Sequence, residues 1–337
     1  MKALKGIRIV EFAGLGPLEH TGMMLSDLGA DVIRIVRPGT SYQTSPILRN
    51  RTTHSLDLKA PEDLRTARNF ITQSDVVLEG MRPGTMERLG LGPNEFAEVA
   101  PKLVYARMTG WGQAGPMSQR AGHDINYLAL TGALWSTRRT GDRPVPPLNL
   151  VGDIGGGSMF LIVGILAALI NRDRTGYGSV IDASIVDGVS SLLQSVHSLR
   201  ADQEWSDEPG DNLFDTGRPW YDVYRCADEK FIAVGAIEPQ FYHELVAGLE
   251  LDISSLPHRS DPQNWPALKK LFTEVFATRS RDDWAQRFEQ SDACVTAVLS
   301  IAEAPAGHHL RSRNTLFPVP GGWSASPAPR FTPLVPE

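Results

Sequence analysis

Residues 7–36 read IRIVEFAGLGPLEHTGMMLSDLGADVIRIV, and this stretch decides the fold. Its two ends, residues 7–10 and 31–36, are short runs rich in β-branched side chains, which favour buried strands. Between them a helical pattern over residues 21–28 stops at Gly29. A strand, a helix and a strand in this order form a βαβ unit, which places the two strands parallel in one sheet.

The same alternation continues along the next part of the chain. Further strands are predicted at residues 54–58, 75–79 and 103–108, with a helix over residues 61–73. An apolar helix follows the glycines at 155–157, and another helix is predicted from residue 187 to about 200. Strands that alternate with helices predict an α/β fold: a doubly wound, Rossmann-like large domain with helices on both faces of a mainly parallel sheet.

A smaller α+β domain is predicted beyond a polar stretch at residues 202–211. Residues 221–226 and 231–236 flank a short polar turn, which is a hairpin pattern. Helices follow at 240–249, 265–276 and 281–288, the last with Ser280 as N-cap. The expected division is a large domain of residues 1–184 and 311–337, a small domain of 222–294, and linkers at 185–221 and 295–310. The tail from residue 318, rich in Pro and Gly, is expected to be mostly irregular.

Composition excludes several classes of protein. The 33 Lys and Arg against 39 Asp and Glu give a net charge of -6 without a basic run, which argues against nucleic acid as a partner. Two cysteines without CxxC spacing argue against a disulfide framework or thiolate metal site and indicate a reducing, cytoplasmic environment. The beginning of the chain does not resemble a signal peptide. The apolar stretch 159–170 is shorter than the roughly 20 residues that span a bilayer, so no membrane partner is expected.

Three arginines follow predicted strands, where doubly wound sheets bind their ligands. Arg37 ends the second strand and suits a phosphorylated ribose, while Arg82 and Arg88 suit phosphates. The alternative for all three is a solvated surface arginine. The first turn begins like a dinucleotide fingerprint but has Glu19 where the third glycine belongs, so that motif fails.

Three other residues are candidates for acid and base chemistry. His123 lies in a glycine-rich loop, residues 109–124, that follows a predicted strand. Asp153 precedes the glycines that open the apolar helix; its ordinary role there is an N-cap, but the glycines also suit close approach of a ligand. Glu238, before Pro239, is a helix cap or a carboxylate that orients an imidazole. His308 and His309 lack a third ligand at useful spacing, so no metal is expected.

Several motifs together resemble the α-methylacyl-CoA racemases. They are Gly122-His123-Asp124-Ile125-Asn126-Tyr127, residues 147–153 (PLNLVGD) and residues 235–240 (GAIEPQ), and the likeness spans nearly the whole chain. Other motifs, such as residues 79–88 and 106–112, are shared with the wider family III CoA-transferases, whereas the element 122–124 is typical of the racemase branch.

The resemblance implies a role for each candidate residue. His123 and Asp153 would be the two acid/base groups, and Glu238 would hydrogen-bond the histidine. Coenzyme A would be held by seven residues: Arg37, Arg82 and Arg88 at its nucleotide and phosphates, with Leu56, Gly122, Asp124 and Tyr127 lining the same pocket. The resemblance also implies an interlocked homodimer, in which the large domain of one chain meets the small domain of the other.

The expected activity is therefore racemisation of 2-methylacyl-CoA thioesters by 1,1-proton transfer through an enolate, with two bases on opposite faces of the α-carbon. Backbone N–H groups of Gly155 and Gly156 are expected to stabilise the enolate oxygen. Coenzyme A is part of the substrate, so no separate cofactor is expected. The alternatives are CoA transfer with Asp153 as nucleophile and a non-catalytic CoA-binding protein. Because Leu18 and Glu19 are larger than their counterparts in the racemases, the sequence does not predict which acyl chain the substrate carries.

Overall fold

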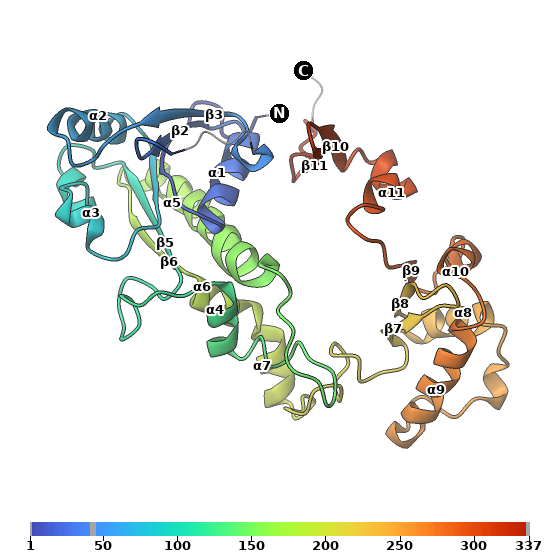
Figure 1. Ribbon diagram of the computed structural model, residues 1–337. Coiled ribbons are helices and arrows are strands. Elements are labelled where there is room, and N and C mark those ends of the chain that lie inside the picture. Colours follow the sequence, from blue (N-terminus) through green and yellow to red (C-terminus); the bar gives the residue numbers. More distant parts are fainter. Residues whose placement is uncertain (1, 41–44, 335–337) are drawn as a thin grey trace. The chain divides into compact units, whose positions relative to one another are not determined.

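The computed structural model describes residues 2–40 and 45–334, and the chain divides into two compact units (Figure 1). The first unit comprises Met1–Leu134, Pro146–Ser195 and Thr315–Glu337. The second comprises Trp135–Val145 and Val196–Asn314. Residues 185–195 thus belong to the first unit, although the sequence predicted a linker there. They contain helix α6 (Ile185–Leu192), which packs against other helices of that unit.

A parallel sheet organises the first unit. Its described strands are β1 (Arg8–Phe12), β2 (Asp31–Val36), β3 (Arg51–Ser55), β4 (Val76–Glu79), β5 (Val104–Thr109) and β6 (Val180–Ser184). They follow the order β3-β2-β1-β4-β5-β6, and all neighbours pair in parallel. This is the doubly wound order, so the predicted fold class is confirmed. Strand β3 begins three residues earlier than predicted, and β6 was not predicted.

Helices cover both faces of this sheet. Helices α1 (Pro17–Asp27) and α5 (Phe160–Thr175) lie on one face, and α2 (Pro61–Thr72) and α3 (Thr85–Arg88) lie on the other (Figure 1). Successive strand side chains alternate between the two cores: Ile9 packs with the first pair of helices and Val10 with the second. Because both faces are buried there, β1, β4 and β5 are mostly apolar, whereas β3 (RTTHS), at the edge of the sheet, is polar and only partly buried.

The segment that carries Asp153 differs from the prediction. Leu150–Met159 forms a π-helix, η3, that continues directly into α5, so Asp153 lies inside a helix and does not precede one. This helix packs against α6 (Ile185–Leu192). A Cβ on Gly188 would lie 1.9 Å from the carbonyl oxygen of Gly156. The glycines therefore allow two helix backbones to approach each other, which corrects the expectation that they make room for a ligand.

Two further helix predictions are corrected. The predicted helix over residues 187–200 is two helices, α6 and α7 (Gln194–Ala201). The helical run from Leu150 to Thr175 has 26 residues, so by length and composition it could cross a membrane, unlike the shorter stretch considered from the sequence. Part of this run, 44% of its most apolar window, is buried inside the structure, and α5 contacts β5 and β6, as a core helix does.

The second unit is an antiparallel sheet with helices. Strands β7 (Tyr221–Arg225) and β8 (Phe231–Gly235) form the predicted hairpin, and β9 (Val295–Ala297) pairs with β8. Around the aromatic core of this unit lie three helices: α8 (Pro239–Gly248), α9 (Trp265–Phe276) and α10 (Arg281–Phe288). The Ser280 side chain caps α10, as predicted, by accepting a hydrogen bond from the Asp283 amide.

The end of the chain is more regular than expected. After the short helix α11 (His308–Ser312), the strands β10 (Leu316–Val319) and β11 (Gly322–Ala325) pair as an antiparallel hairpin. The sequence did not predict this hairpin, whose tight turn is provided by Gly321 at φ 85°. Residues 326–334 form no helix or strand, as the prediction of a mostly irregular tail requires.

Candidate active site

A cavity of about 1160 Å³ opens where strands β1 to β4 of the first unit end. Four residues predicted to bind coenzyme A line it: Arg37, Leu56, Arg82 and Arg88. Its other walls include Gly14 and Leu15, which lie in the turn between β1 and α1. Parallel strands present their carboxyl ends at one edge, so side chains from distant parts of the sequence meet there. The cavity contains cationic and apolar groups, which suits an anionic ligand with an apolar arm.

Buried ion pairs support the loop that carries Arg82 and Arg88. The carboxylate of Glu79, at the end of β4, accepts hydrogen bonds from Nε of Arg107 (2.8 Å) and from the amide of Met81 (2.7 Å). Arg107 also pairs with Glu87 at 2.8 Å. Burial raises the pKa of Glu79, and the hydrogen bond from Arg107 opposes that shift. The loop is thus fastened at both ends to strand residues.

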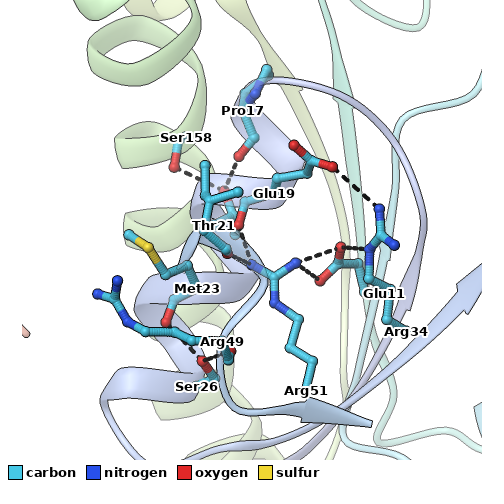
Figure 2. A network of polar contacts seen from close by, with 11 residues as sticks. Glu11, Pro17, Glu19, Thr21, Met23, Ser26, Arg34, Arg49, Arg51 and Ser158 are labelled. Carbon is cyan, nitrogen blue, oxygen red and sulfur yellow. Dashed lines mark hydrogen bonds and ion pairs between the residues drawn. The ribbon is translucent and has the colours of Figure 1, made fainter. Parts of the chain in front are cut away.

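A second buried network lies between β1, β2, β3 and the start of α1 (Figure 2). The Glu11 carboxylate is fully buried and pairs with Arg51 (2.7 Å) and Arg34 (3.2 Å). Arg34 also pairs with Glu19 at 3.2 Å, and the Arg51 guanidinium donates to the carbonyl oxygen of Glu19. Burial raises the pKa of Glu11 and lowers that of Arg51, because it penalises both charges. The network fixes the first turn of α1.

His123 is held at the start of helix α4 (Asp124–Thr131). It is the N-cap residue, with extended backbone, and its amide donates to Oδ1 of Asn126 at 3.0 Å. Beneath it, Tyr127 packs edge-on against Trp111 with ring centroids 4.7 Å apart. A Cβ on Gly122 would lie 2.8 Å from both aromatic rings. The predicted pocket residues Gly122 and Tyr127 therefore pack together with Trp111, while His123, between them in the chain, is exposed.

Asp153 lies in the first turn of η3, near the beginning of the long helix. Burial is the main cause of its raised pKa; the neighbouring Asp124 adds to it, and a hydrogen bond from Asn149 and the charge of His123 oppose it. Burial thus raises the pKa of a carboxyl group that lies in the first turn of a helix. A Cβ on Gly16 would lie 2.9 Å from Oδ2 of Asp153, so the turn between β1 and α1 lies against this carboxyl group.

The turn between β1 and α1, residues 13–16, joins the cavity to the carboxyl group of Asp153. Gly14 and Leu15 line the cavity, and Gly16 lies against Asp153. His123 and Asp153 come from opposite sides of a long loop, yet they are close enough to interact electrostatically. The arrangement offers an imidazole and a carboxyl group with raised proton affinity beside a cationic cavity. Such a pair can move a proton to and from a bound ligand.

The two predicted oxyanion donors are not available in this arrangement. The amide of Ile154 donates to the carbonyl of Asn149 at 3.1 Å, which opens the five-residue hydrogen-bond pattern of the π-helix. The amides of Gly155 and Gly156 lie inside this pattern and are used within the helix. Their expected contact with a ligand oxygen was wrong, because the helix begins before Asp153 and not after it.

Glu238 belongs to the second unit. It is the N-cap residue of α8, with Pro239 at the first helical position, as its sequence context suggested. Its interaction with His123 stays a prediction. Among residues 2–40 and 45–334, no group of three or more His, Cys, Asp or Glu side chains is placed to hold a metal ion.

Sequence reasoning missed the buried charges Glu11, Arg51 and Arg107. A signal existed for two of them, since Glu11 and Arg107 each interrupt an otherwise apolar strand. A charged side chain in a strand of a sheet that is buried on both faces needs a partner of opposite charge. Which residue is that partner depends on the order of the strands in the sheet.

Comparisons with known proteins agree with this geometry. Residues 4–335 match the model of CoA-transferase family III. Alpha-methylacyl-CoA racemase from Mus musculus is 43% identical over 98% of this chain and 86% of its own length. The protein of that name from Homo sapiens is 44% identical over 94% and 82%. A CAIB/BAIF family protein from Brucella suis has the same fold, with a TM-score of 0.83 at 22% identity, over 98% of this chain and 92% of that chain. The chain belongs to CoA-transferase family III.

Proposed function

We propose that this member of CoA-transferase family III is a racemase of 2-methylacyl-CoA thioesters. The observation that carries the proposal is the placement of His123 beside Asp153, with burial raising the pKa of that carboxyl group. The 43–44% identity to two alpha-methylacyl-CoA racemases supports it. A nucleophilic aspartate needs no imidazole at this position, whereas inversion of a carbon centre needs a second proton-transfer group.

The proposed reaction is a 1,1-proton transfer. A thioester acidifies its α-carbon because sulfur donates electrons poorly into the carbonyl, so the enolate places its charge on oxygen. Neutral His123 removes the proton from one enantiomer while protonated Asp153 delivers a proton to the opposite face. The other enantiomer uses imidazolium and carboxylate in the reverse roles. The raised pKa of Asp153 favours its protonated form, which the first direction requires.

The cationic cavity is the proposed site for the coenzyme A part of the substrate. Arg37, Arg82 and Arg88 carry the charge that its phosphates need, and Leu56 supplies an apolar wall. Coenzyme A is then part of the substrate, and the reaction needs no separate cofactor. Both cysteines, Cys226 and Cys294, are free thiols, and we propose a reducing, cytoplasmic setting for the protein.

Arg88→Gln is expected to weaken binding without slowing the chemical step. The guanidinium lines the cavity and hydrogen-bonds the Thr85 side chain at 3.0 Å, so its loss removes binding energy that is equal in the ground and transition states. We expect KM to rise about tenfold, with kcat within about threefold of the parent. Steady-state kinetics measure this, with the exposed Arg65→Gln as the matched control. A fall in kcat at unchanged KM would contradict the assignment.

A homodimer is the proposed assembly. The outer side of the η3 and α5 helix exposes Met159 (39%), Val163 (62%) and Ile170 (65%), which makes an apolar stripe at helical spacing. A second copy of the chain would cover such a stripe, in an interlocked arrangement of the kind that the resemblance implies. Sedimentation velocity measures the assembly, and a monomer at micromolar concentration would contradict it.

The test of the proposed function is α-proton exchange followed by NMR in D2O. Because the proton delivered is not the one removed, each enantiomer of a 2-methylacyl-CoA ester should give product that carries deuterium at the α-carbon. A small panel of branched fatty, sterol-like and aryl-propionyl esters identifies the acyl group. The same samples are tested with free carboxylate acceptors. Movement of CoA to an acceptor without α-exchange would establish the transferase alternative, and binding with neither reaction would establish a CoA-binding protein.

A further inference from the structure

The two proposed catalytic groups lie on opposite sides of an excursion of the chain. After α4, the chain leaves the first unit at Leu134, contributes Trp135–Val145 to the second unit, and returns at Pro146. His123 precedes this excursion and Asp153 follows it. Their separation is therefore set by contacts between α4 and η3 and not by the short backbone connection that joins neighbouring elements.

One of these contacts joins the two segments directly. Oδ1 of Asp124, the residue after His123, accepts a hydrogen bond from the backbone amide of Asp153 at 2.7 Å. The approach depends on Gly152, because a Cβ at that position would lie 2.2 Å from the same oxygen. Among the described side chains, the helix's own N-cap residue, Asn149, makes no capping hydrogen bond. Asp124 thus supplies from another helix the acceptor that a helix start requires.

We propose that Asp124 is a positioning residue: its hydrogen bond to the Asp153 amide is a clasp that holds the imidazole-bearing and carboxyl-bearing segments at a fixed spacing. The inference rests on the proposed racemisation and goes beyond it. The resemblance implied a role for Asp124 in lining the CoA pocket, whereas its contacts place it between the two acid/base groups. One carboxylate, adjacent in sequence to the first group and bonded to the backbone of the second, sets their distance.

The clasp also has an electrostatic consequence. Oδ2 of Asp124 is buried and accepts no hydrogen bond from the residues that the structure describes. Three nearby groups act on the pKa of Asp153: Asp124, His123 before α4, and Asn149 before η3. Tyr127 of α4 is also close, because its own pKa is raised by the charges of Asp153 and Asp124. Of these, the Asp124 carboxylate raises the pKa of Asp153, and His123 and Asn149 lower it. Spacing and proton affinity are thus set by the same side chain.

Two substitutions separate these effects. Asp124→Asn keeps an oxygen that can accept the Asp153 amide but removes the charge. Asp124→Ala removes both. We expect Asp124→Ala to lower kcat about 100-fold with KM within about threefold, because misplacement by about 1 Å has that effect on an oriented reaction. For Asp124→Asn we expect kcat within about tenfold of the parent. With the enantiomer that reacts through the Asp153 carboxylate, the acid limb of the pH profile of kcat/KM should move to lower pH by about 0.5 unit, because the pKa of Asp153 falls when the neighbouring charge is removed. Glu62→Gln, a first-turn carboxylate of α2, is the matched control.

A measurement independent of activity tests the clasp itself. Hydrogen exchange followed by mass spectrometry should show faster exchange of peptides covering residues 150–156 in Asp124→Ala, and parent-like exchange in Asp124→Asn. Peptides of β1 and β4 report whether the unit stays folded. If the parent lacks α-exchange in D2O, the proposed function fails while this result still judges the clasp. Parent-like exchange in Asp124→Ala, or an unmoved acid limb in Asp124→Asn, would overturn the inference.

Discussion

Asp153→Asn and His123→Gln should each lower racemisation about 1000-fold, because each removes one of two proton-transfer groups, and such groups contribute between 100-fold and 10,000-fold. The remaining group still faces one side of the α-carbon. Each variant should therefore keep some deuterium exchange with a single enantiomer, with retention of configuration, and the two variants should prefer opposite enantiomers. NMR in D2O with resolved enantiomers measures both quantities.

The control for this experiment is Asp173→Asn. Asp173 is an exposed carboxylate at the end of α5, far along the helix from Asp153, and its pairing with Arg172 is peripheral. Asp173→Asn should leave deuterium exchange at the α-carbon unchanged. Residual exchange of both enantiomers by both variants would argue for a single base with free access to either face. Full racemisation by His123→Gln would rule out the imidazole as a proton-transfer group.

Glu11→Ala should destabilise the first unit by about 3 to 5 kcal/mol, which is the effect of removing one partner from a buried ion pair. The side chain of Arg51 is only 1% exposed and would lose the carboxylate that it contacts at 2.7 Å. Of its two ion pairs with described residues, Arg34 would keep the one with Glu19. The uncompensated guanidinium then has to remain buried or disrupt the contact between β3 and the start of α1.

Urea-dependent hydrogen exchange of peptides from β1 to β3 measures this loss in the first unit alone, which matters because the chain has two units. Glu62→Ala is the matched control, since its pair with Arg65 is exposed and should contribute less than about 1 kcal/mol. The double variant Glu11→Leu with Arg51→Met should recover part of the stability. A loss below about 1 kcal/mol in Glu11→Ala would show that the network does not hold this part of the fold.

The local patterns of the sequence were sufficient for the fold class. Apolar runs such as residues 31–36 form strands because both of their faces are buried, and that requirement is visible in the residues themselves. Strand β6 escaped prediction because three of its five residues are exposed or partly exposed and it leads at once into α6. The hairpin at the end of the chain escaped because its Pro and Gly content resembles that of a loop.

Within the candidate site, the sequence predicted which residues carry chemistry. The arginines that follow β2 and β4 line one cavity, and the charge of His123 acts on the carboxyl group of Asp153. The roles of the glycines were misjudged. The sequence shows that Gly156 has no side chain, but only the fold shows that the neighbour needing the space is the backbone of α6.

The amino-acid sequence by itself determined the alternation of strands and helices and the family to which the chain belongs, because periodicity and motif are properties of neighbouring residues. Tertiary structure alone decided the proton affinity of Asp153, the capping of its helix by Asp124 and the pairing of Glu11 with Arg51. These depend on burial and on the charges of residues distant in the chain, and both arise only when the sheet has brought those segments together.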